Sequence, residues 1–78
     1  MRTINTIAKE IILNWKTMSP YAKPYAEAML SLHTLNDNYI CEDGRSIVLY
    51  FLSNAGSWRG DTARRIKKEL NDILKGEK

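Results

Sequence analysis

At 78 residues, with 44% apolar residues, 27% charged residues and a formal net charge of +3, the chain has the composition of one small globular domain and not of a disordered tail. Its one cysteine, Cys41, excludes an internal disulfide, its longest apolar run (residues 47–52) is far shorter than the ~20 residues that cross a bilayer, and its first residues lack the apolar stretch of a signal peptide. We therefore expect a soluble, cytoplasmic protein with one domain over residues 1–78 and no membrane partner.

The first predicted helix begins after Thr3, whose side chain can cap it, and ends before Pro20, because proline is excluded from a helix interior. Its apolar residues recur at the spacing of one helical face. They are Ile4, Ile7, Ala8, Ile11, Ile12 and Trp15.

The second predicted helix begins between Pro20 and Pro24, since proline is tolerated in a first helical turn. It ends at Asn36-Asp37-Asn38, a run with strong turn propensity. Its apolar stripe consists of Tyr21, Tyr25, Ala28, Met29, Leu32 and Leu35.

A loop over residues 36–43 follows, in which Tyr39, Ile40 and Cys41 are expected to pack inward as a short extended piece. Asp43 or Ser46 then caps a third element over residues 45–55. Residues 47–52 are apolar on every side, so periodicity does not distinguish a buried helix from a buried strand. We predict a helix, because no second strand is available to pair its backbone, and Gly56 is expected at its C′ position.

The last predicted helix is capped by Asp61 and stopped by Gly76. Its inward residues are Ala63, Ile66, Leu70, Ile73 and Leu74. On its outer face we expect the i,i+4 ion pairs Asp61–Arg65, Arg65–Glu69 and Lys68–Asp72. The predicted fold is therefore all-α, a compact bundle of about four short helices whose third helix is central and buried.

The sequence offers no set of residues suited to catalysis or metal binding. Its one histidine, His33, has no carboxylate at a useful spacing, and Cys41 stands beside Glu42 and Asp43, whose charges oppose formation of a thiolate. One cysteine and one histidine do not make a zinc site, and no phosphate-binding glycine loop is present. We expect no cofactor, no metal and no enzymatic activity.

Trp58 and the basic residues after it are the candidates for a contact surface. Trp58 lies in a loop between Gly56 and Gly60, where an indole either fills a gap between helices, the favoured interpretation, or anchors a partner. A cluster of exposed cations either decorates a solvated face or binds phosphate or an acidic partner. The candidate contact residues are Trp58, Arg59, Arg64, Arg65, Lys67 and Lys68.

The last two predicted helices also suggest a helix-turn-helix element that reads nucleic acid with its basic second helix. The intervening turn is longer than the three or four residues that are usual for this motif. The outward residues near the start of the second helix are Arg and Lys, which hold phosphate but select base sequence poorly.

The chain resembles short proteins encoded by bacterial phages and mobile elements. The segments that carry this resemblance are residues 43–52, 57–60 and 62–70, together with Tyr25-Ala26-Glu27-Ala28-Met29 and the opening helix. The resemblance implies an accessory protein that acts by binding and not by catalysis, often by blocking a host defence complex.

Two functions are therefore expected. The first is a phage or mobile-element accessory protein that inhibits or modulates a host protein or ribonucleoprotein complex handling nucleic acid. The second is direct binding of nucleic acid through the basic last helix. The first is favoured, because +3 is a low net charge for a nucleic-acid-binding protein.

Overall fold

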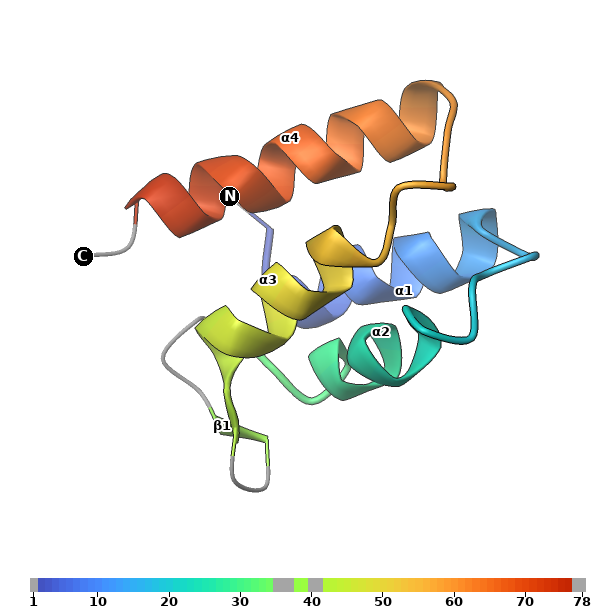
Figure 1. Cartoon of the computed structure of the whole chain (residues 1–78). Helices are drawn as coiled ribbons and strands as arrows, with labels where there is room; N and C mark the ends of the chain where they lie inside the picture. Colours follow the sequence, from blue (N-terminus) through green and yellow to red (C-terminus); the bar gives the residue numbers. More distant parts are fainter. Residues whose placement is uncertain (1, 35–37, 40–41, 77–78) are drawn as a thin grey trace.

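Figure 1 shows a computed structural model of the chain, in which residues 2–34, 38–39 and 42–76 are described. These residues form the helices α1 (Ile4–Asn14), α2 (Lys23–Met29), α3 (Gly44–Ser53) and α4 (Asp61–Gly76). Two short strands, β1 (Asn38–Tyr39) and β2 (Glu42–Asp43), pair antiparallel just before α3. The all-α bundle predicted from the sequence is confirmed. Ile40 and Cys41, which were expected to pack inward, lie outside the described residues.

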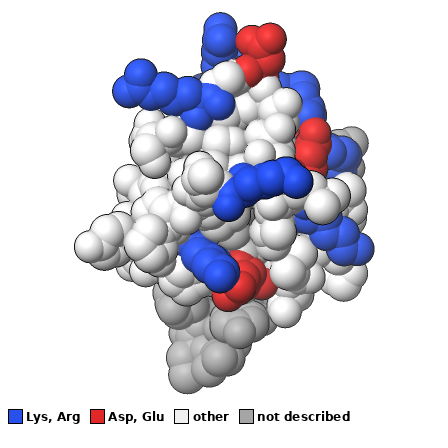
Figure 2. All heavy atoms as spheres, turned by 90° about the vertical axis from the view of Figure 1, so that its right-hand side faces the viewer, with Lys and Arg blue, Asp and Glu red and all other residues white. Residues whose placement is uncertain are grey.

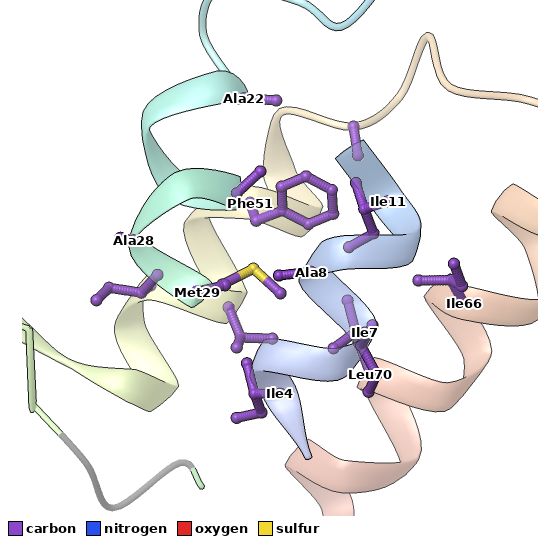
Figure 3. Packing of buried hydrophobic residues seen from close by; sticks show 14 of the residues in the cluster. Ile4, Ile7, Ala8, Ile11, Ala22, Ala28, Met29, Phe51, Ile66 and Leu70 are labelled. Carbon is purple, nitrogen blue, oxygen red and sulfur yellow. The ribbon is translucent and has the colours of Figure 1, made fainter. Parts of the chain in front are cut away.

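The hydrophobic core lies where the four helices meet. α1 packs against α2 and α4, and α3 packs against the same two helices. Figure 3 shows α1 between the other elements, with Met29 and Phe51 on one side and Ile66 and Leu70 of α4 on the other. Within the described part of the chain, no polar or charged side chain is buried. Apolar burial therefore supplies the main stabilisation of the fold.

α1 follows the predicted pattern with two corrections. Thr3 precedes the helix, but its side chain makes no capping hydrogen bond and instead contacts the side chains of Asn5 and Thr6. Ile12 is 37% exposed, because it stands at the edge of the buried arc rather than within it. Trp15 follows the last helical residue and is buried, as expected.

α2 is shorter than predicted. Backbone hydrogen bonds from Leu30 to Glu27 and from Leu32 to Met29 span three residues, so the chain tightens beyond Met29 and does not continue as an α-helix. Tyr21 precedes the helix and is 74% exposed, which corrects its expected place in the core. Leu35 lies outside the described residues.

α3 is the helix predicted over the strand alternative, and its cap is Asp43, whose carboxylate accepts a 2.7 Å hydrogen bond from the Ser46 backbone N–H. Its buried face consists of Ile47, Val48 and Phe51. Leu49 and Tyr50, however, are 46% and 48% exposed. The helix is therefore buried on one face and not on all sides, because α2 and α4 flank it and leave the outer face to solvent.

Two expectations about glycine and Asp61 need correction. α3 ends at Ser53 with Asn54 in the C-cap position, so Gly56 is not its C′ residue. α4 begins at Asp61, and the Gly60 carbonyl accepts the first helical hydrogen bond, from the Arg64 N–H at 3.0 Å. Gly60, and not Asp61, therefore occupies the cap position. Its φ of +112° is one that favours glycine.

Candidate binding surface

Trp58 is a core residue. Its side chain is 3% exposed, its ring stacks on Trp15 with centroids 5.4 Å apart, and its edge meets Phe51 at 6.3 Å. The indole Nε1–H donates a 3.1 Å hydrogen bond to Oδ1 of Asn14, so its one polar atom is satisfied. The interpretation of Trp58 as a filler between helices is therefore confirmed. Its side chain does not belong to an exposed contact surface.

The contacts of Trp58 hold the loop between α3 and α4 against the rest of the fold. The ring joins the end of α1, through Trp15 and Asn14, to Phe51 of α3. The carbonyl of Trp58 also accepts a 2.7 Å hydrogen bond from Nζ of Lys67 on α4. The next residue, Arg59, is exposed and lies beside the start of α4.

A group of four charged residues, here called the charge network, joins α4 to α1. Arg2 contacts Glu69 through two hydrogen bonds, of 2.9 Å from Nε and 2.6 Å from Nη2, and contacts Glu10 at 2.7 Å. Arg65 contacts Glu10 and approaches Glu69 at 4.0 Å. Each carboxylate of the network thus faces two guanidinium groups.

The charge network shifts the pKa values of its own members. Hydrogen bonds from Arg2, and then from Arg65, hold the pKa of Glu10 below its ordinary value, and the hydrogen bonds from Arg2 lower the pKa of Glu69. The pKa of Arg2 is raised by its hydrogen bonds to Glu69 and Glu10. Arg2, Glu10 and Glu69 are therefore charged at neutral pH, and their ion pairs tie α4 to the N-terminal part of the chain.

The cations at the other end of α4 are arranged differently. Lys16, Arg59, Arg64 and Lys67, here called the basic end, come from the connection after α1, the loop before α4 and the first two turns of α4. Figure 2 views the molecule from the side on which these segments lie in Figure 1, and blue Lys and Arg atoms are more widespread there than red ones. These four cations lie around two shallow hollows that have Arg59 in common.

Carboxylates are scarce around the basic end. In the described ranges, neither Lys16 nor Arg59 has an ion-pair partner, and Lys67 donates to the carbonyl of Trp58. Arg64 is 80% exposed and contacts Asp61 at 3.3 Å, an i,i+3 pair that replaces the predicted pair of Asp61 with Arg65. Burial, and then repulsion from Arg59, lowers the pKa of Lys67. The basic end therefore carries excess positive charge that an anion would offset.

Lys68, the last predicted contact residue, points outward and pairs with Asp72 at 3.0 Å, as expected from the i,i+4 spacing. An exposed pair of this kind contributes little to stability, about 0.3–0.5 kcal/mol. The predicted contact residues are thus divided by the fold. Arg59, Arg64 and Lys68 are exposed and Lys67 is partly buried, whereas Trp58 is buried and Arg65, also exposed, pairs with Glu10 of α1.

Lys16 was missed by sequence reasoning. It lies more than 40 positions before Arg59 in the sequence, and no local pattern links the two residues. The same holds for Arg2 and Glu10, since Glu10 meets Arg65 across a separation of 55 residues. The packing of α1 on α4 brings these groups together, and this packing cannot be deduced from the spacing of either helix alone.

The described part of the chain was also compared with the requirements of a metal site and of a membrane span. Among residues 2–34, 38–39 and 42–76, no three His, Cys, Asp or Glu residues cluster as metal ligands would. No helix in those ranges combines the length and the apolar character needed to cross a membrane. What the surface can do chemically is hold anionic groups by charge-assisted hydrogen bonds.

The connection between α3 and α4 covers residues 54–60, longer than the three or four residues of a helix-turn-helix. The stripe Arg64, Lys68 and Lys75 runs along the exposed side of α4, but Asp61 precedes it and Asp72 lies within it. Both features depart from the pattern of a helix-turn-helix element.

No protein-family model, no curated protein sequence and no solved structure matches this chain.

Proposed function

We propose that this protein is a non-enzymatic binding protein whose basic end docks on an acidic surface of a host complex that handles nucleic acid, and so inhibits or modulates that complex. The observation that carries the proposal is the convergence of Lys16, Arg59 and Lys67 without an ion-pair partner in the described chain. Cations with no carboxylate nearby raise the local potential and steer association with an anionic partner.

A protein partner suits this surface better than nucleic acid does. The basic end is a cluster at one end of the molecule. The exposed side of α4 carries Asp61, which pairs with Arg64 of the basic end, and further along it carries Asp72, which pairs with Lys68. Nucleic acid presents a continuous line of phosphates, which those carboxylates would repel. An acidic patch on a protein needs only a local match of charge.

The test is affinity capture from a bacterial lysate with the immobilised full chain. The variant Arg59→Glu/Arg64→Glu reverses two exposed cations of the basic end, and Lys9→Glu/Lys75→Glu reverses two exposed lysines elsewhere with the same change in net charge. The proposal expects a captured host complex that the first variant loses and the second retains. Equal retention by both variants, with both folded by circular dichroism, would refute it.

Direct binding of nucleic acid is the second candidate, favoured by the stripe of Arg64, Lys68 and Lys75 along α4. Anisotropy of labelled duplex DNA at about 50 and 200 mM salt separates the two candidates, because phosphate neutralisation makes affinity fall steeply with salt. Tight, salt-sensitive binding that Lys68→Glu weakens would favour the nucleic-acid function over the proposed one.

A further inference from the structure

An apolar hollow lies beside the basic end, between the end of α1 and the start of α2. Its apolar lining consists of Ile12, Trp15 and Met18, and its rim carries Lys16, Lys23 and Glu27. The hollow has a volume of about 190 Å³. This is below the ~300 Å³ at which pockets for whole small molecules begin, so it suits one inserted side chain.

This hollow continues into the basic end. Trp15 and Lys16, which line it, also line a second hollow, which is one of the two around the basic end and is lined by Arg59 as well. Trp58 and Arg59 then line both the second hollow and a third, which reaches Arg64 and Lys67. Neighbouring hollows thus share lining residues in series, from an apolar pocket to the cations of the basic end, and the three together are here called the track.

We propose that this track binds an extended, acidic peptide segment of the partner, with one apolar side chain of that segment seated between Ile12 and Met18. This inference rests on the proposed function and names the chemistry of the partner. Carboxylates of the segment contact Lys16 and Arg59, and further ones contact Arg64 and Lys67.

Charge complementarity determines the choice of occupant. Glu27 is the one carboxylate among the described residues that line the three hollows, and Lys23 stands four positions before it on the same helix. The remaining charges along the track are all positive. Ile12 is 37% exposed and Met18 is only partly buried. An apolar side chain inserted between them would bury its own surface and theirs, which favours binding.

The test uses two fluorescein-labelled peptides, one of consecutive glutamates ending in a single leucine and one with serine in place of that leucine. We expect the leucine peptide to bind the full chain about ten-fold more tightly by anisotropy, the factor that burial of one aliphatic side chain supplies. Ile12→Gln should abolish this preference. Leu13→Gln should preserve it, since Leu13 is 74% exposed and lies outside the three hollows.

The outcomes separate this inference from the proposed function. Equal binding of the two peptides, lost in Arg59→Glu/Arg64→Glu, would overturn the apolar anchor and leave the acidic partner in place. Binding of neither peptide at low salt would overturn both. A leucine preference that survives Ile12→Gln, in a variant whose melting curve matches that of Leu13→Gln, would place the anchor elsewhere and overturn the inference.

Discussion

The charge network and the basic end both draw cations from α4, but only the cations of the network face carboxylates from another part of the chain. In the network, Arg2 and Arg65 each face Glu10 and Glu69, and the charges are balanced. At the basic end, Lys16 and Arg59 face no carboxylate of the described chain. The difference arises because the two groups use different faces of α4. Arg65 pairs with Glu10 of α1, whereas its neighbour Arg64 points to solvent. Composition alone does not reveal this division.

The largest expected effect comes from the aromatic cluster that supports the basic end. Trp58→Ala removes a ring in contact with Trp15 and Phe51, and large-to-small core changes of this kind cost about 3–5 kcal/mol. We expect the melting temperature to fall by more than about 10 °C in a domain of this size. Thermal unfolding followed by circular dichroism measures it. Lys67→Met, which removes the ammonium group and its hydrogen bond to the Trp58 carbonyl but leaves the aromatic rings in place, is expected to cost far less.

The next effect tests the charge network. Arg2→Gln removes two hydrogen bonds to Glu69 and one to Glu10 in a partly exposed setting, so we expect a loss of about 1 kcal/mol in the free energy of unfolding. Lys9→Gln, at an exposed position of α1, is the matched control and should change stability by less than about 0.5 kcal/mol. Urea unfolding measures both variants. Equal unfolding midpoints for the two would show that the network contributes no stability.

The network also predicts how stability depends on pH. The pKa values of Glu10 and Glu69 are lowered in the folded state by the arginines, so their contribution is fully present above the unfolded value of about 4.3. It is lost as the pH falls through the lower folded values, because protonated carboxyl groups no longer pair with Arg2 and Arg65. We expect the melting temperature to drop below about pH 4 and to drop less steeply in Arg2→Gln. Parallel curves for the two proteins would contradict this.

The sequence was informative wherever apolar spacing and capping decide the structure. The inward face of α4 was predicted correctly, and Asp43 was one of the two caps expected for α3. The burial of Trp58 was the favoured of two interpretations, although the residue was also named as a candidate contact. These features depend on residues a few positions apart or on the large cost of exposing an indole.

The features that the sequence did not predict depend on tertiary packing. Tyr50 looked like core because residues 47–52 are apolar on every side, yet the helix has flanking partners on only some sides, and this residue is left half exposed, against Tyr25. Arg65 was assigned to the contact surface as one of a run of cations. Its ion pair with Glu10 could not be foreseen, because Glu10 comes from the first helix. Lys16 was omitted for the same reason, since its place beside Arg59 follows from the packing of α1 and not from any motif.

The most direct test compares the adjacent variants Arg64→Gln and Arg65→Gln, measuring for each the melting temperature and the affinity for a glutamate peptide at 25 °C. Arg64→Gln should weaken binding several-fold and leave the melting temperature within about 2 °C of the wild type, since exposed substitutions change stability little. Arg65→Gln should lower the melting temperature by a few degrees, the shift expected for a loss of about 0.5–1 kcal/mol, and leave the affinity unchanged. If both substitutions weakened binding equally without a change in melting temperature, the division between a stabilising network and an open basic end would be wrong.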